Sequence, residues 1–232
     1  MPYTLLMRIA GPMQSWGTKS RFDERDTELE PSKSGVIGLL CAALGVDREE
    51  ERPVLELAAM PMGVRVDREG ILRRDYHTAQ EVIRADGKGV QDTAVSIRYY
   101  LADAVFLVGL EGSDRARLET IQAALKNPVW PISLGRKSFV PSQPVWLEDG
   151  LREAGLEEAL LTYPALTDAR PARLILEAKR GSLRMDNPIS SFARRRFGAR
   201  FVESRIYKPP YPNQALQLCL EHEPPCLPIG RP

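Results

Sequence analysis

Apolar and polar residues alternate at the start of the chain. Tyr3, Leu5, Met7 and Ile9 are separated by single residues, and Ala10-Gly11-Pro12 then interrupts the pattern. A period of two places these four side chains on one face of an extended backbone. The pattern predicts a first β-strand that ends at this Gly-Pro pair.

Helical spacing replaces the alternation twice. Apolar residues from Val36 to Leu44 recur every three or four positions after Pro31–Ser34, whose serines are suitable helix caps. A second run of this kind covers Leu118 to Leu125 and begins near Ser113 or Asp114. The spacing predicts two helices, the first capped by a serine and the second by Ser113 or Asp114.

Extended segments lie between these two helices. Met62–Arg68 and Ile71–His77 each alternate and are separated by Glu69-Gly70, which predicts that they pair as a β-hairpin. The polar, glycine-containing stretch that follows gives way to Val95–Leu110, which is rich in β-branched and aromatic residues. We therefore expect an insertion around residues 78–98 that projects as a loop or hairpin.

The predicted order of elements is β-α-β-β-α-β. This is the order of a ferredoxin-like (RRM-like) α+β domain, in which two helices cover one face of an antiparallel sheet and leave the other face free. We assign residues 1–147 to this domain. Residues 148–232 are expected to form a smaller β-rich region, with a short helix within Leu151–Leu161, strands at Ala172–Ala178 and Phe201–Tyr207, and a proline-rich surface tail.

Composition limits the class of protein. The chain has 232 residues, of which 43% are hydrophobic, so it can bury a substantial core. A formal net charge of +1 excludes a uniformly basic nucleic-acid binder but allows a local basic groove. No apolar run approaches the roughly 20 residues that span a bilayer, and Arg8 interrupts any signal-peptide core. We expect a cytoplasmic protein without membrane contact.

The cysteines do not suggest a disulfide framework or a paired metal motif. Cys41, Cys219 and Cys226 are odd in number and irregular in spacing. His222 lies near the last two, but three ligands in a proline-rich segment make a poor metal site. Ala85–Gly89 lacks the spacing of a phosphate-binding loop. We expect no metal, no cofactor and no small-molecule substrate.

The clearest basic segment lies near the C-terminus. Gly181–Lys208 carries a formal charge of +5, with Arg194, Arg195 and their neighbours interleaved with aromatic residues such as Phe192 and Phe197. A charge run is often only a solvated face. Because aromatic rings alternate with the cations, the composition favours a surface that binds RNA or a negatively charged protein.

Gln14, Ser15 and Trp16 follow the first strand directly. They offer an amide, a hydroxyl and an indole, and an unpaired base could stack on the indole. A lone tryptophan more often packs as a lid over the core. From these residues alone, both interpretations of Trp16 are about equally good.

Ser32, Lys33 and Ser34 lie at the start of the first predicted helix. Free backbone N–H groups and the helix dipole favour an anion there, and Lys33 with two hydroxyls would complete a phosphate site. The alternative is an ordinary serine cap beside a solvent-facing lysine. The residues leave both open.

Two further pairs could contact RNA. Arg136 and Lys137 lie in a glycine-bearing turn, which suits phosphate contact and equally an exposed loop. Tyr76 and His77 could supply acid-base groups for RNA cleavage without a metal. A tyrosine and histidine that merely contact RNA or the core are the commoner arrangement.

Four motifs together resemble one known family. Arg8–Gly17, Ser32–Leu40, Arg74–Thr78 and Leu134–Ser138 occur in order and resemble the CasD family, the 5′-handle-binding subunit of the type I-E CRISPR Cascade complex. The resemblance covers about the first 140 residues. It implies a fold of the RAMP superfamily: an RRM-like domain, a projecting thumb hairpin around residues 78–98, and a smaller C-terminal β region.

The resemblance also implies a function. The chain would be a non-catalytic subunit for antiviral defence that holds the 5′ handle of the CRISPR RNA. Its thumb would cap the filament of backbone subunits through Val82, Ile83 and Val90, and the large target-recognition subunit would be a further partner. The RNA-binding residues expected are Gln14, Ser15, Trp16, Ser32, Lys33, Ser34, Tyr76, His77, Arg136, Lys137, Arg194 and Arg195.

Two other functions remain as alternatives. One is a metal-independent endoribonuclease that processes CRISPR repeat RNA with His77, Tyr76 and Lys137. The other is a protein-only scaffold whose basic segment binds an acidic partner. Retention of RNA without cleavage would separate the expected function from both.

Overall fold

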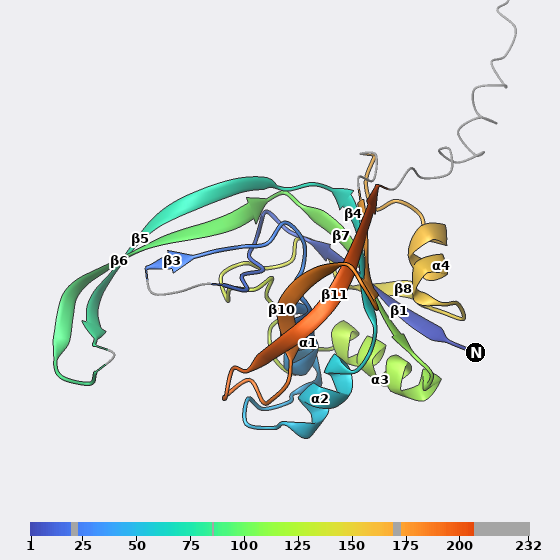
Figure 1. Ribbon diagram of the computed structural model, residues 1–232, viewed down its shortest axis with the longest axis horizontal. Coiled ribbons are helices and arrows are strands. Elements are labelled where there is room, and N and C mark those ends of the chain that lie inside the picture. The colour runs from blue at the N-terminus through green and yellow to red at the C-terminus, as the bar shows by residue number, and fades with distance from the viewer. Residues whose placement is uncertain (20–22, 85, 169–172, 207–232) are drawn as a thin grey trace, which may run out of the picture.

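A seven-stranded antiparallel sheet is the centre of the computed structural model, which describes residues 1–19, 23–84, 86–168 and 173–206 (Figure 1). Its strands lie in the order β10-β11-β9-β4-β7-β1-β8. Their bounds are β1 Tyr3–Ala10, β4 Met62–Arg68, β7 Val105–Gly112, β8 Trp146–Arg152, β9 Arg173–Ala178, β10 Ser182–Pro188 and β11 Phe197–Ile206. The alternation at the start of the chain thus correctly predicted β1.

Helices cover both faces of this sheet. α1 (Lys33–Leu44), α2 (Arg52–Ala58) and α3 (Arg115–Lys126) pack together on one face, and α4 (Leu156–Thr162) contacts β1, β4 and β7 from the other. The expectation of a free sheet face is therefore wrong. β1 shows why both faces are covered. Met7 belongs to the core beneath α1, and the adjacent Leu6 belongs to the core beneath α4.

A second sheet contains the projecting hairpin. Among the described residues it consists of β2 (Met13–Gln14), β3 (Glu24–Arg25), β5 (Ile71–Ile83) and β6 (Val90–Ala102). β5 and β6 pair from their shared root to their tip and arch away from the rest of the molecule (Figure 1). Strand pairing starts several residues before the insertion expected at residues 78–98.

The predicted pairing of Met62–Arg68 with Ile71–His77 is wrong. β4 pairs with β7 and β9, whereas β5 pairs with β6. The difference follows from burial, because almost every residue of β4 is buried and most of β5 is exposed. The Glu69-Gly70 turn therefore connects two sheets and does not close a hairpin.

The predicted helix caps are confirmed. Ser32 is the N-cap of α1, and its hydroxyl accepts a hydrogen bond from the backbone N–H of Gly35. Asp114, one of the two candidates, caps α3 and accepts from Arg117 N–H. Local hydrogen bonding sets both helix starts, so they could be identified without tertiary information.

The C-terminal strands extend the main sheet. β9 pairs with β4 on one side and with β11 on the other, and β11 pairs with β10. The sheet thus crosses the proposed division between residues 147 and 148, and that division stays a prediction. The proline-rich tail expected from residue 209 lies outside the described residues. No described helix is long and apolar enough to cross a membrane.

Candidate functional site

Three of the sequence motifs contact one another in the folded chain. The ring of Trp16 lies against Gly35, at whose position a Cβ would be 2.7 Å from the ring. The backbone N–H of Ser15 donates to the carbonyl oxygen of Leu134 at 3.0 Å. The loop after β2, the start of α1 and the loop after α3 therefore form one packed junction.

The expectation that Trp16 stacks on a base is wrong for this structure. Its side chain is 1% exposed, and its indole Nε1 donates to Gln14 Oε1 at 3.2 Å. Gln14 is also buried, and its amide Nε2 donates to Ala104 O at 2.7 Å. The Ser15 hydroxyl is directed to the carbonyl oxygen of Tyr99 at 3.3 Å. These three residues hold the junction together and present no open face to RNA.

The phosphate site expected at the start of α1 is also corrected. Asp186 from β10 already accepts from Lys33 N–H at 2.8 Å, so a protein carboxylate occupies the helix N-terminus. The Lys33 ammonium is 1% exposed and lies 2.9 Å from Glu177. Burial lowers the pKa of Lys33, and the hydrogen bond and charge of Glu177 oppose that effect. Ser32 and Ser34 bond to each other through their hydroxyls at 3.5 Å.

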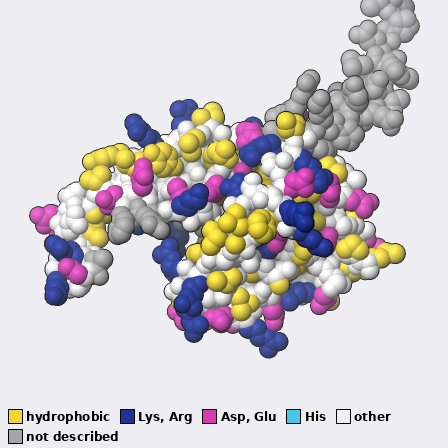
Figure 2. Space-filling model, viewed as in Figure 1, with side chains coloured by type: hydrophobic (Ala, Val, Ile, Leu, Met, Phe, Trp, Pro, Cys, Tyr) yellow, Lys and Arg dark blue, Asp and Glu magenta, His cyan; other side chains and the backbone are white. Residues whose placement is uncertain are grey.

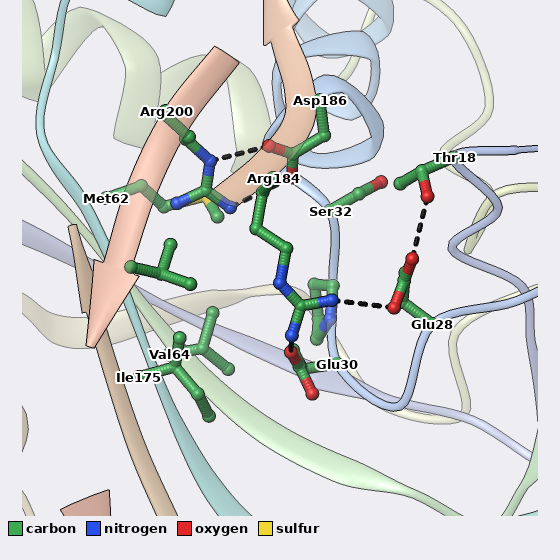
Figure 3. A pocket seen from close by; sticks show the side chains of 12 residues that line it. Thr18, Glu28, Glu30, Ser32, Met62, Val64, Ile175, Arg184, Asp186 and Arg200 are labelled. Carbon is green, nitrogen blue, oxygen red and sulfur yellow. Dashed lines mark hydrogen bonds and ion pairs between the residues drawn. The ribbon is translucent and has the colours of Figure 1, made fainter. Parts of the chain in front are cut away.

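A small pocket beside this site is lined by ion pairs (Figure 3). Arg184 reaches Glu28 at 2.6 Å and Glu30 at 2.5 Å, and Thr18 Oγ1 donates to Glu28 at 2.7 Å. Burial alone would raise the pKa of Asp186, but the hydrogen bonds and charge of Arg200, with the N–H of Lys33, hold it below its ordinary value. The charged side chains that line the pocket are thus already paired with one another.

Cations gather instead at the root of the hairpin. Arg25 on β3 pairs in register with Arg98 on β6, and Arg136 Nη2 donates to Tyr99 O on β6 at 2.9 Å. Burial lowers the pKa of Arg136, and the charges of Arg98 and Arg25 lower it further, while Asp75 and Asp26 oppose them. We name Arg25, Arg98 and Arg136 the hairpin-root cluster.

Gly135 makes the position of Arg136 possible. Its φ is +92°, and a Cβ there would lie 1.8 Å from Ser15 O. Only glycine combines this left-handed conformation with such a close backbone approach. The glycine-bearing turn predicted from the sequence therefore places Arg136 beside the hairpin, with Lys137 exposed next to it.

The hairpin has two distinct faces. Asp75 lies opposite Arg98 and His77 opposite Ser96, so these side chains share the face of the hairpin-root cluster. Tyr76 lies opposite Ile97 and is 68% exposed on the reverse face. Figure 2 shows hydrophobic side chains along the outer edge of the hairpin. Tyr76 and His77 therefore point to opposite sides.

The basic segment near the C-terminus is divided by the fold. Arg184 and Arg200 turn inward to acidic partners. Arg194 and Arg195 are exposed in the loop between β10 and β11, where Arg194 lies 3.1 Å from Glu51 just before α2. The structure thus places them beside α2, whereas Arg136 lies against β6. Net charge along the chain does not show in which direction each side chain points.

Sequence reasoning missed Arg25 and Arg98. Arg98 is the last residue of the insertion expected at residues 78–98. Its place in that insertion was the only feature of the sequence that pointed to it as a site residue. Arg25 had none, because the pairing of β3 with β6 brings it to the site. Over the described residues no group of three or more His, Cys, Asp or Glu could hold a metal ion. Cys219, His222 and Cys226 lie outside them.

The chain is similar to several known proteins. Residues 4–203 match the model of a family described as CRISPR-associated protein (Cas_Cas5). The CRISPR system Cascade subunit CasD of Escherichia coli (strain K12) is 34% identical over 173 residues, which cover 68% of this chain and 76% of that protein. A solved structure described as a Cas protein is 51% identical, with a TM-score of 0.73 over 88% of this chain and 95% of that one. A chain of a CRISPR RNA-guided surveillance complex is 33% identical, with a TM-score of 0.71 over 94% and 98%.

Proposed function

The chain belongs to the Cas5 family of CRISPR-associated proteins, as a CasD-type Cascade subunit, and we propose that it holds the 5′ handle of the CRISPR RNA without cutting it. The observation that carries this proposal is the hairpin-root cluster. Three arginines from three separate segments converge at one place, with two acidic neighbours, Asp75 and Asp26. A local excess of guanidinium groups beside an extended strand suits an RNA backbone.

The cluster supports a bent RNA strand under the hairpin. Arg73, Asp75 and His77 lie on the same face as Arg98, and Lys137 is exposed beside Arg136. Figure 2 shows basic side chains in the angle between the hairpin and the body. In this arrangement the arginines bind phosphates and His77 can reach the bases or sugars of the handle, whereas Tyr76 lies on the reverse face.

The arrangement of strands supports a ferredoxin-like assignment for the first part of the chain. β8, β1, β7 and β4 are neighbours in that order, and α1 and α3 follow β1 and β7 along the chain. The β5–β6 hairpin then corresponds to an insertion between the second and third strands of that fold. We assign it as the thumb of the family.

The thumb would bind the adjoining backbone subunit through its reverse face and tip. Leu72, Tyr76 and Val95 are exposed on the reverse face, and Ile83 and Val90 lie opposite each other near the tip. Exposed apolar side chains on an otherwise polar arm are typical of a protein contact. The large target-recognition subunit would be a further neighbour in the complex.

The geometry argues against the endoribonuclease alternative. Cleavage by Tyr76, His77 and Lys137 requires the three side chains to converge on one phosphate. Adjacent residues of a strand point to opposite faces, and Tyr76 and His77 do so here. His77 Nδ1 lies 4.0 Å from Asp75, on the face opposite to Tyr76.

The test is retention of labelled CRISPR repeat RNA in EDTA, with cleavage scored in the same samples. Arg98→Ala and Arg136→Ala should each weaken binding, because each removes a cation from the phosphate path. The salt dependence, as the slope of log K against log salt, should fall by about one per lost contact.

Arg115→Ala, an exposed arginine on α3, is the matched control and should bind as the unmodified chain does. Unchanged affinity and slope in both hairpin-root variants would remove the cluster from the RNA site. Cleavage that disappears in His77→Ala would establish the nuclease instead.

A further inference from the structure

We propose that Arg184 is a positioning residue that holds Arg25 in place for RNA, an inference that rests on the proposed function. Arg184 lies on β10, in the C-terminal part of the sheet, whereas Arg25 lies on β3 beside the hairpin. The two are linked through Glu28 and Glu30, which follow Arg25 closely in the chain. We name Arg184, Glu28 and Glu30 the Arg184 clamp.

The clamp is a closely bonded group of three side chains (Figure 3). One guanidinium nitrogen of Arg184 donates to Glu28 and the other to Glu30. Glu30 is 8% exposed and also accepts from Arg173 at 3.3 Å. Charge-assisted hydrogen bonds from both ends of a planar guanidinium restrain position and orientation more than a single contact does.

The residues that follow β3 are also bonded to the loop after β2. Trp16 N–H donates to Thr27 Oγ1 at 2.9 Å, and Glu28 N–H donates to Trp16 O at 3.3 Å. Thr18 N–H and Lys19 N–H both donate to Asp26, at 3.3 and 3.0 Å. Residues 16–19 and 26–28 are therefore bonded side by side, and the clamp joins the second stretch to β10.

β3 is short and makes few backbone hydrogen bonds to the hairpin. It contains only Glu24 and Arg25, which pair in register with Ile97 and Arg98, and Ile97 N–H adds one bond to Asp23 O at 2.7 Å. So few backbone hydrogen bonds offset little of the entropy lost when a loop is ordered. Glu28 of the clamp follows Arg25 by three residues in the chain. Through this short connection the clamp keeps the Arg25 guanidinium beside Arg98.

The clamp leads to a prediction opposite to that of simple electrostatics. Glu28 and Glu30 are negative charges that follow Arg25 closely in the chain, so by charge alone their neutralisation should strengthen RNA binding at Arg25. If they position Arg25 through Arg184, their neutralisation should weaken binding. Arg184 itself is engaged by both carboxylates and is not a phosphate ligand in this arrangement.

The experiment compares the double variant Glu28→Gln and Glu30→Gln with Glu24→Gln, an exposed acid on β3. Each glutamine keeps the shape of the acid and one acceptor oxygen, but it loses the charge and the second acceptor. We expect the double variant to bind labelled repeat RNA about 10-fold more weakly, with a salt slope lower by about one contact. The Glu24→Gln control should bind equally well or more tightly.

A double-mutant cycle with Arg25→Ala separates positioning from a general loss of structure. In the Arg25→Ala background, the clamp variant should have no further effect on RNA affinity, because the residue that it positions is already absent. Arg184→Lys, which keeps the charge but not the two-carboxylate geometry, should restore only part of the affinity lost in Arg184→Met.

The outcomes distinguish this inference from the proposed function. Equal or tighter binding by the clamp variant, with normal binding by the unmodified chain, overturns the role of Arg184. Additive losses in the cycle overturn it as well. A failure of the unmodified chain to retain RNA would contradict the proposed function instead.

Discussion

At Gly135 the backbone takes a φ of +92°, and a Cβ there would lie 1.8 Å from Ser15 O. We therefore predict that Gly135→Ala destabilises the protein by about 2–4 kcal/mol, because both backbone strain and a backbone clash follow. Urea unfolding monitored by tryptophan fluorescence checks the value. Gly87→Ala, also at positive φ but with nothing within 4 Å, is the control and should cost about 1 kcal/mol. Equal effects of the two changes would show that the contact with Ser15 is unimportant.

Lys33 is a residue whose charge serves the fold. Its ammonium is buried against Glu177 and has no path to a bound phosphate. We predict that Lys33→Ala lowers the free energy of unfolding by about 3 kcal/mol, because a carboxylate loses its buried partner. The salt slope of RNA binding by the folded variant should equal that of the unmodified chain. A lower slope, measured at a temperature where the variant is folded, would restore Lys33 as a phosphate contact.

Among the elements, β10 and β11 hold the start of α1 through Asp186. This carboxylate bonds Arg200 at 2.7 Å and caps the free N–H of Lys33. Its pKa lies below the ordinary value of 3.8, so the unfolded chain takes up the proton more readily than the native one. Its contribution to stability is therefore complete above the ordinary pKa and is lost as the pH falls through the lowered pKa.

We predict that Asp186→Asn removes this part of the acid sensitivity. The variant should be less stable at pH 7 by about 2–4 kcal/mol, since the buried Arg200 loses its nearest counter-charge and keeps only Glu177 at 4.0 Å. Its stability should then fall less steeply than that of the unmodified chain as the pH decreases below about 4. Chemical unfolding at a series of pH values measures both. Glu119→Gln, on the exposed surface of α3, should retain the original pH profile.

At the scale of the whole molecule, the core and the hairpin contribute unequally to stability. The seven-stranded sheet of the described residues has helices on both faces, and the hairpin stands outside that core (Figure 1). Beyond its root, β5 and β6 are largely exposed. Little apolar area is therefore buried by the outer half of the hairpin, and its contribution to the free energy of unfolding is small.

We predict that shortening the hairpin leaves the fold intact. Deleting residues 80–93 and joining the paired residues Ala79 and Ala94 through Asn-Gly keeps the strand register. The midpoint of thermal unfolding should change by less than about 3 °C, because few buried contacts are lost. Co-purification with the other Cascade subunits should be lost. A large drop in the midpoint would show that the tip supports the core.

Local patterns determined much of this protein. The alternation of β1, the cap residues Ser32 and Asp114, and the presence of an extended insertion around residues 78–98 depend on residues close in the chain. Such signals are short-range, so they survive without knowledge of the tertiary structure. The family was also evident from the sequence, since each of its motifs is an uninterrupted run of residues.

Only the tertiary structure decided what the motif side chains do. Trp16 and Lys33 resemble RNA ligands in sequence, but Gly35 and Glu177, distant in the chain, enclose them. Arg184 and Arg194 belong to one basic segment, yet one turns inward to Glu30 and the other lies in an exposed loop. Charge and residue type can be determined from a sequence. Burial and direction depend on which strands pair and which residues pack together, and long-range contacts set both.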